Sequence, residues 1–466
     1  MNTTLETDYL IIGSGAVGMA FADTLLTETN ATITIVDKLD KPGGHWNFAY
    51  PFVKLHQPSA YYGVNSMELS KGRVDKVGFN KGLNELATGP EVLAYFNDVM
   101  QHKFLPSGRV TYFPLCEYHG SGIFKSTLTD KIFEVQVKKK IVDATHLKTA
   151  IPATHTPSFE VASGVQFIPL NNLPSIKKRP SGFVVIGGGK TAIDACLWLL
   201  EHHINPDLIT WIVPRDAWLL NRKNYQLNNN HFEYFLNDQA IQFESLAQAD
   251  SIPDLFDRLE KGGSLLRIDK KILPKMYRCA TVSEEELEQL RRIKHVIRKG
   301  RVKRINQNQI ALEKGNISTS PENIHIDCSA CGLSYPQLKP VFDGDLITIQ
   351  TVRSCQPTFS AAFIAHIEAE YETEAIKNEI CTVIPVPNRD IDWIIMMALR
   401  MKNQFNWNKN EEVFKWLQNS RLEGGFAGKL ATIPKDNEKQ QAILERIRKN
   451  IEPAMLKLQL FMKQLN

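Results

Sequence analysis

Two glycine-rich segments hold the residues whose types and spacing are best suited to chemistry. The first is Gly13-Ser14-Gly15-Ala16-Val17-Gly18, which follows the apolar run 9–12 and precedes the helical run 19–26. Gly13 permits a tight turn, Gly15 lets the backbone approach a pyrophosphate, and Gly18 allows close packing of helix on strand. The start of the helix offers free N–H groups and a positive dipole end to phosphates, so the segment predicts a dinucleotide site.

An acidic residue completes this first unit. A second apolar strand, residues 32–36, ends in Asp37, whose carboxylate can accept hydrogen bonds from ribose hydroxyls. Strand, loop, helix, strand and acid occur in the expected order, which favours a dinucleotide site over an ordinary glycine turn.

The same pattern occurs again after the strand 183–186, in Gly187-Gly188-Gly189-Lys190-Thr191-Ala192. Here the second strand, 209–213, is followed by Pro214 and Arg215 instead of an acid. A guanidinium binds a 2′-phosphate in a fork, whereas an acid would repel it, so this site predicts a preference for NADPH over NADH. Lys190, Arg222 and Lys223 are further candidates for the phosphate, and a solvated loop arginine is the alternative interpretation of Arg215.

One resemblance within this loop is misleading. Gly189-Lys190-Thr191 matches the end of a P-loop, but that motif needs a glycine where this chain has Val184, inside the strand. The sequence therefore excludes an ATPase of this class.

Composition sets wider limits. The 466 residues are 43% hydrophobic and 23% charged with a net charge of +4, which is typical of a globular protein rather than a nucleic-acid or membrane-surface binder. The seven cysteines are scattered, so we expect no disulfide framework and a reducing, cytoplasmic location. We also expect no transmembrane segment and no signal peptide, because no apolar run approaches the required length of about 18 residues.

The stretch after Asp37 resembles a known family. Lys41-Pro42-Gly43-Gly44-His45-Trp46 resembles the GG-x-W segment that follows the flavin-site acid in flavin-containing and Baeyer–Villiger monooxygenases. The order of first glycine loop, GG-x-W, second glycine loop and arginine is similar to that of these enzymes, and the resemblance covers residues 1 to about 375. Further matches are the helix 90–96 before a strand at 110–113, two crossover strands at 140–145 and 326–332, and a helix at 356–368 whose start points at the flavin ring in the family.

The resemblance implies an α/β fold with two Rossmann-like domains and a helical extension. The FAD-binding domain spans 1–175 and resumes at 321–385, the NADPH-binding domain with a largely helical insertion spans 176–320, and the helical C-terminal extension spans 386–466. The cofactor-binding residues that we predict are Gly13, Gly15, Ala16, Gly18, Asp37, Lys38, Gly44, His45, Trp46 and Thr145 for FAD, and Gly187, Gly189, Lys190, Thr191 and Arg215 for NADPH.

The expected reaction is hydride transfer from NADPH to FAD and then to oxygen, with oxygenation of a small organic substrate. The flavin-monooxygenase signature F-x-G-x-x-x-H would lie near residues 167–172, where this chain lacks its glycine and histidine. Two alternatives therefore stay open: a flavin-dependent reductase or dehydrogenase without oxygen insertion, and a non-catalytic FAD and NADP(H) sensor. Self-association is left open.

Residues 50–62 lie where the family brings side chains near the flavin. His56 can exchange protons near neutral pH and Gln57 can hydrogen-bond a ring edge, so these two are the candidate catalytic residues. A histidine satisfied by the backbone is the alternative.

Two other groups of residues suggest functions that we do not expect. Eight basic side chains between residues 291 and 304 lack the interleaved aromatics of a nucleic-acid site, and a solvated helix end with an edge strand explains them. Cys328 and Cys331 form a CxxC, but it lies on the second crossover, so we expect neither a redox dithiol nor a metal site.

Overall fold

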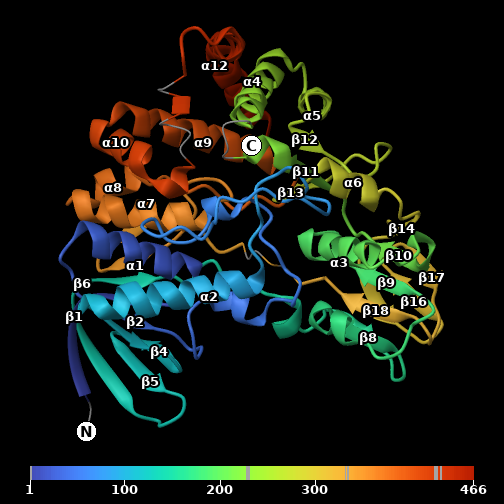
Figure 1. Ribbon diagram of the computed structural model, residues 1–466, viewed down its shortest axis with the longest axis horizontal. Helices are drawn as coiled ribbons and strands as arrows, with labels where there is room; N and C mark the ends of the chain where they lie inside the picture. The colour runs from blue at the N-terminus through green and yellow to red at the C-terminus, as the bar shows by residue number, and fades with distance from the viewer. Residues whose placement is uncertain are drawn as a thin grey trace.

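The computed structural model describes residues 3–226, 231–330, 332, 335–424, 429–430 and 433–465. Two parallel sheets dominate them and lie on opposite sides of the molecule, with helices of the C-terminal region above (Figure 1). This arrangement confirms the expected α/β fold class.

The first sheet carries the first glycine loop. Its central strands are parallel, and every residue of β2 is buried, as expected for a strand covered on both faces. The order along the sheet is β19 (Phe342–Asp343), β20 (Leu346–Thr348), β6 (Ile132–Asp143), β1 (Thr3–Ile12), β2 (Ile33–Val36) and β3 (Val110–Phe113), with β4 (Cys116–Gly120) and β5 (Ile123–Ser126) attached to β6.

The second sheet is parallel throughout and carries the second glycine loop. Its order is β14 (His295–Ile297), β10 (Ile209–Ile212), β9 (Phe183–Ile186), β18 (Ile324–Asp327) and β8 (Gln166–Pro169). The range expected for the second domain is 176–320, but β8 lies before it and β18 lies after it. Both strands belong to the second sheet, which they extend beyond β9. The second domain is nevertheless nested in the first, since β19 and β20 return to the first sheet.

Helices cover the sheets and hold the two loops. α1 (Ala16–Glu28) packs against α7 (Pro357–Glu370), and their buried faces join Phe21, Phe359 and Phe363 in one apolar cluster. α2 (Gly89–Val99) begins with a capping box between Thr88 and Glu91, in which each side chain accepts a hydrogen bond from the other residue's backbone N–H. α3 (Lys190–Glu201) packs beside α6 (Glu284–Leu290) in a second cluster, on the other domain.

The segment 216–294 differs from the expected largely helical insertion. It contains the helices α4 (Phe232–Gln248) and α5 (Ile252–Lys261), and the Ser251 side chain caps α5 by accepting a hydrogen bond from the Asp254 N–H. It also contains a three-stranded sheet made of β12 (Leu265–Leu266), β11 (Ala217–Asn221) and β13 (Met276–Val282). Apolar side chains of this sheet pack against those of the helices. A further sheet near the second domain consists of β17 (Gly315–Ser318), β16 (Gln309–Leu312), β15 (Val302–Ile305) and β7 (Glu160–Val161).

The C-terminal region is helical, as expected, and packs on the insertion. The long α12 (Glu438–Leu465) lies against α4 and α9, at the top of Figure 1. Among the described residues, α8 (Glu374–Ile380) precedes this region, and α9 (Asp392–Lys409) and α10 (Glu411–Asn419) lie within it.

One disulfide corrects the expectation drawn from the scattered cysteines. Cys279 in β13 and Cys355, just before α7, are bonded across 76 residues with their Cα atoms 6.2 Å apart. The bond joins the insertion to the first domain. No local pattern predicts this bond, because the two cysteines are brought together only by the tertiary fold.

Candidate functional site

The first glycine loop has the backbone that the motif predicts. Gly13 has a φ of +99°, which favours glycine, and Gly15 is the N-cap of α1. A Cβ built at Gly18 would lie 2.0 Å from the carbonyl oxygen of Gly13, so only glycine lets the helix approach the turn this closely. No side chain caps α1 at Gly15, and the N–H groups of its first turn are left for a ligand.

Asp37 lies beside this loop at the end of β2. Its Oδ2 accepts hydrogen bonds from the backbone N (2.6 Å) and Oγ (2.7 Å) of Ser14, and its Oδ1 accepts one from the N of Leu39 (2.8 Å). Each carboxylate oxygen has two lone-pair directions, so the buried group retains acceptor capacity toward a ribose. The neighbouring Lys38 is exposed.

The GG-x-W segment packs on the same loop. A Cβ built at Gly44 would lie 3.0 Å from the Cα of Gly15, so the two glycine backbones are in close contact. His45 is exposed and stacks on the buried Trp46, whose Nε1 donates to the Tyr62 hydroxyl at 2.7 Å. The structure therefore brings these predicted residues together with the first loop.

Thr145 reaches the loop from the first crossover. Its Cγ2 lies 3.0 Å from the position that a Cβ on Gly13 would take, and its Oγ1 donates to Asp143 Oδ1 at 2.7 Å. The crossover thus faces Gly13.

The second glycine loop is shaped by close backbone contacts. A Cβ at Gly187 would lie 2.4 Å from the Cys328 carbonyl oxygen, and one at Gly188 would lie 2.7 Å from that of Arg215. Around the Cβ position of Gly189, the N-cap of α3, no atom of the described residues lies within 4 Å. This open space at a helix N-terminus without a side-chain cap suits a phosphate group.

Lys190, the first residue of α3, is engaged by the protein. Its ammonium group pairs with Asp194 one turn later, and the hydroxyl of the buried Tyr50 donates to the other oxygen of Asp194 at 2.5 Å. Burial together with Asp194 raises the pKa of Tyr50 well above its usual value, so the phenol keeps its proton. Tyr50 therefore fixes the first domain to α3. Thr191 is half-buried in the first turn of the same helix.

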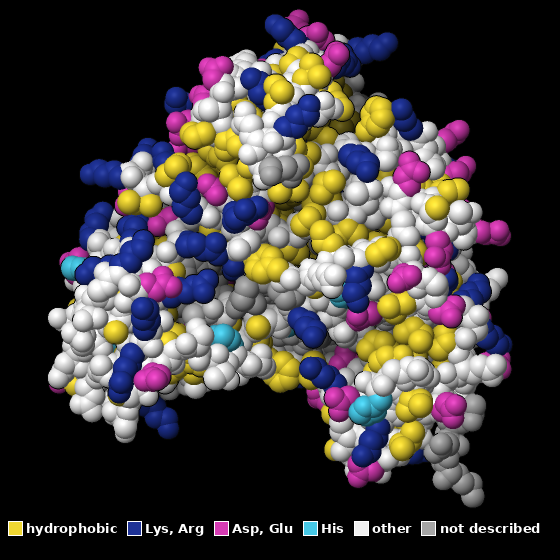
Figure 2. Space-filling model, turned by 180° about the vertical axis from the view of Figure 1, so that it is seen from behind, with side chains coloured by type: hydrophobic (Ala, Val, Ile, Leu, Met, Phe, Trp, Pro, Cys, Tyr) yellow, Lys and Arg dark blue, Asp and Glu magenta, His cyan; other side chains and the backbone are white. Residues whose placement is uncertain are grey.

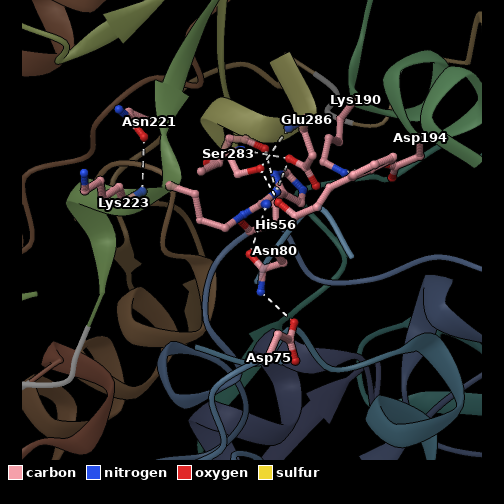
Figure 3. Close-up of polar contacts among 12 residues, drawn as sticks. His56, Asp75, Asn80, Lys190, Asp194, Asn221, Lys223, Ser283 and Glu286 are labelled. Carbon is pink, nitrogen blue, oxygen red and sulfur yellow. Dashed lines mark hydrogen bonds and ion pairs between the residues drawn. The ribbon is translucent and has the colours of Figure 1, made fainter. Parts of the chain in front are cut away.

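His56 lies in a polar cluster between the two domains (Figure 3). Burial, with Lys190 and Arg222 nearby, lowers the pKa of His56 to about 3. The imidazole is therefore neutral across the physiological pH range, and the expected proton exchange near neutral pH is not supported. The neighbouring Gln57 is half-buried, and its catalytic role stays a prediction.

Arg222 is the centre of this cluster. It is fully buried, forms an ion pair with Glu286 at 2.9 Å, and donates to the carbonyl oxygens of His56 (3.1 Å) and Thr281 (3.2 Å) and to Oδ1 of Asn80 (3.2 Å). Its donors are used within the protein, so it is not a phosphate ligand. It joins the first domain to the insertion, and its partner Glu286 is held in place by a capping box with Ser283.

Two other groups have residue types that are suited to redox or metal chemistry. Cys328 is buried as a free thiol, and burial raises its pKa, which disfavours a reactive thiolate; Cys331 lies outside the described residues. Glu28, His366 and Glu370 bring three possible metal-ligand atoms within 4.8 Å of one another. Glu28 is already bonded to His366 Nδ1 and Trp416 Nε1, both at 2.7 Å, and this pairing accounts for the group without a metal.

A small cavity of about 190 Å³ opens beside both crossovers. Leu147 lines it from the first crossover and Tyr335 and Leu338 line it from the second, while Val383 and Ile384 close it from the segment before α9. No motif indicated these residues, since their spacing in the sequence follows no pattern. Seen from behind, the molecule is also hollowed between its two lower lobes (Figure 2).

Comparison with known proteins places this architecture. Uncharacterized protein Rv2000 of Mycobacterium tuberculosis (strain H37Rv) is 49% identical over 419 residues, which cover 90% of this chain and 78% of that protein. Uncharacterized protein Mb2023 of Mycobacterium bovis matches to the same extent. The chain belongs to the family of these mycobacterial proteins.

A domain family and several solved structures resemble this chain in fold. Residues 11–67 match the NAD(P)-binding Rossmann-like domain, which contains the first glycine loop and Asp37. An oxidized steroid monooxygenase bound to NADP has a TM-score of 0.51 and 13% identity over 78% of this chain and 85% of its own. Open cyclohexanone monooxygenase gives a TM-score of 0.48 and 14% identity over 86% and 97% of the two chains. The expected resemblance to such monooxygenases is confirmed at the level of fold.

None of the helices formed by the described residues combines the length and the apolar character that a bilayer-spanning helix needs.

Proposed function

We propose that this protein is an FAD-containing, NADPH-dependent oxidoreductase. One observation carries the proposal: two helices, α1 and α3, each begin at a glycine N-cap, at the carboxyl ends of strands in two separate parallel sheets. Ligands of such sheets bind at the carboxyl ends of the strands, and phosphates bind at helix N-termini. A chain with two such sites is suited to bring two dinucleotides together.

The first site would hold FAD and the second NADPH. Asp37 at the first site suits a ribose, and Arg215 at the second suits a 2′-phosphate. The residues that would hold FAD are Gly13, Gly15, Ala16, Gly18, Asp37, Lys38, Gly44, His45, Trp46 and Thr145, and those that would hold NADPH are Gly187, Gly189, Lys190, Thr191 and Arg215. When bound, the nicotinamide supplies a hydride and the flavin accepts it.

The chain's own contribution is to fix the two sites relative to each other. Tyr50 bonds to Asp194 on α3, and Arg222 binds the His56 carbonyl, so the segment after the GG-x-W turn is anchored to the second domain. Hydride transfer requires the reacting atoms to be positioned to within a few tenths of an ångström. We infer that these contacts are positioning contacts.

We further propose that oxygen is the electron acceptor and that a small organic molecule is the substrate. The mostly apolar cavity of about 190 Å³ beside the crossovers supports a small apolar substrate. The missing monooxygenase signature at residues 167–172 favours the second candidate, a flavin-dependent reductase that passes electrons to another acceptor. The four free, buried cysteines of the described residues support a cytoplasmic location, whereas the Cys279–Cys355 disulfide is unusual in a reducing compartment.

The test begins with the purified protein. We expect flavin absorbance, release of FAD on denaturation, and NADPH oxidation faster than NADH oxidation at equal concentration. Absence of flavin from protein that is folded by circular dichroism, and failure to take up added FAD, would refute the proposal. Comparing NADPH consumption with and without oxygen, and with peroxide measured, then distinguishes oxygenation from reduction of another acceptor.

A further inference from the structure

The Cys279–Cys355 disulfide joins two segments that share an uncommon backbone conformation. Cys279 has a φ of +55° and Cys355 has a φ of +60°, in the left-handed region that residues other than glycine seldom adopt. The four free cysteines of the described residues do not share this conformation. Such conformations persist where surrounding contacts impose them, and they cluster at switch segments. We therefore expect both segments to relax when the bond opens.

On the insertion side, Cys279 lies at a break in the pairing of β13 with β11. The register shifts between Trp218 and Leu220 of β11, where β13 bulges at residues 278–280. A bulge leaves residues without ladder partners and bends the strand. The sheet therefore holds this part of β13 less firmly than the two ends of the strand.

On the other side, the turn before α7 is held only in part by its own contacts. The backbone N–H of Arg353 donates to Ser360 Oγ at 3.2 Å. The side chains on either side of Cys355 contribute less, because Ser354 Oγ and Gln356 Oε1 are buried without a hydrogen-bond partner among the described residues. Buried polar atoms without partners destabilise the conformation that buries them, so the disulfide is an important restraint on this turn.

Both joined segments are connected to the cavity beside the crossovers. Thr351, four residues before Cys355, lines the cavity and donates through Oγ1 to the Ile384 carbonyl oxygen at 2.7 Å. Ile384 also lines the cavity, and it packs in one apolar cluster with both cysteines. From β13, the N–H of Tyr277 donates to the Asn388 carbonyl oxygen at 3.3 Å, just beyond the cavity wall. Movement of either segment would therefore reach this wall.

We propose that Cys279 and Cys355 form a redox latch, a reversible thiol–disulfide site that fixes the insertion to the wall of the cavity. Disulfides in a reducing compartment are usually transient and serve catalysis or redox sensing. Strained disulfides are also reduced more readily than structural ones, and here both ends of the bond have a strained backbone. The role of the cavity as a substrate site rests on the proposed function, whereas the chemistry of the latch does not.

Opening the latch takes two electrons and two protons from a dithiol. A thiolate of the dithiol attacks the sulfur of Cys355, the more exposed residue of the pair, and the bond to the sulfur of Cys279 breaks. Cys279 takes up a proton, and the second thiol of the reductant then attacks the mixed disulfide. Cys355 leaves as a thiol while the reductant closes its own disulfide, and an oxidised dithiol reverses both steps.

The latch is tested on the full chain in its folded state, with dithiothreitol as the reductant. Thiols are alkylated with iodoacetamide and identified by mass spectrometry, and exchange of backbone amides with D2O is measured on the same samples. We expect Cys279 and Cys355 to become alkylated together while the protein stays folded. Amides of residues 276–282 and 352–356 should then exchange on the order of 10-fold faster, and those of 183–186 in the second sheet should not change.

Two variants separate the latch from general effects of the reductant. Cys279→Ser should show the faster exchange without dithiothreitol and should not respond to it. Cys116→Ser removes a buried free thiol and should respond as the wild type does. Reduction of the pair only after unfolding in urea, or reduction without faster exchange in either segment, overturns the latch. Neither measurement uses FAD or NADPH, so failure of the latch leaves the proposed function standing.

Discussion

Gly15→Ala should weaken FAD binding with little change in stability, whereas Gly18→Ala should lower the stability of the fold. A Cβ at Gly15 would lie 3.6 Å from the Cα of Gly44, an ordinary contact, and Gly15 has a φ of −71° that alanine adopts freely. We therefore expect Gly15→Ala to change the free energy of unfolding by no more than about 0.5 kcal/mol. A Cβ at Gly18 would lie 2.0 Å from the Gly13 carbonyl oxygen, so backbone must move, which lowers the free energy of unfolding by about 2–3 kcal/mol.

The affinity for FAD, by contrast, should fall in Gly15→Ala. The added methyl group stands where the loop must approach the pyrophosphate, and loss of one hydrogen bond to a charged phosphate weakens binding by about 1.5–3 kcal/mol, or about 10- to 150-fold. The assay is titration of the apoprotein with FAD by fluorescence quenching, beside urea unfolding of the same apoprotein. Wild-type affinity in Gly15→Ala would refute the assignment of the loop. A loss of stability equal to that of Gly18→Ala would show that Gly15 serves the fold alone.

Three further predictions concern stability. The pKa of His56 is lowered to about 3 in the folded protein, so below pH 6.5 the unfolded chain binds a proton that the folded chain does not. The free energy of unfolding should therefore decrease as the pH falls from 6.5 toward 3. His56→Gln should reduce the difference between the urea midpoints measured at about pH 7.5 and about pH 5.5. An unchanged difference would contradict this reasoning. Arg222→Met leaves Glu286 buried without its partner and should lower the free energy of unfolding by about 3–5 kcal/mol. The double variant with Glu286→Leu should regain part of this loss. A double variant less stable than the single one would argue against an isolated buried charge as the cause. Cys355→Ser removes a covalent link across 76 residues and should lower the free energy of unfolding by about 2–4 kcal/mol. A reducing agent should then have no further effect on the stability of this variant. A reductant effect that persists in Cys355→Ser would point to another bond.

The local units of this fold could be predicted from the sequence because their residues are close together in the chain. Gly13, Gly18 and Asp37 form one strand–helix–strand unit, and the second loop repeats it with Arg215. The helix caps at Ser251 and Ser283 are local in the same sense, because each side chain accepts a hydrogen bond from a backbone N–H three residues later.

The contacts between distant segments could not be predicted in this way. β11 and β13 pair across the insertion, and Arg222 meets His56 across 166 residues, so no local pattern records either contact. The low pKa of His56 follows mainly from burial in the folded protein, with Lys190 and Arg222 nearby, which is why the residue type alone suggested neutral-pH proton exchange.

The nesting of one domain in the other has a consequence for biosynthesis. β20 pairs with the last residues of β6, Ile141 to Asp143, only after the whole second domain has been made. At ribosomal rates of about 5–20 residues per second, the roughly 200 intervening residues take on the order of 10–40 s. During this interval the end of β6 is an open strand edge, able to pair with another nascent chain. Slowing translation should therefore favour aggregation before residue 346 has been made, and an early-folding second domain would shorten the exposure by bringing the ends of the interruption together.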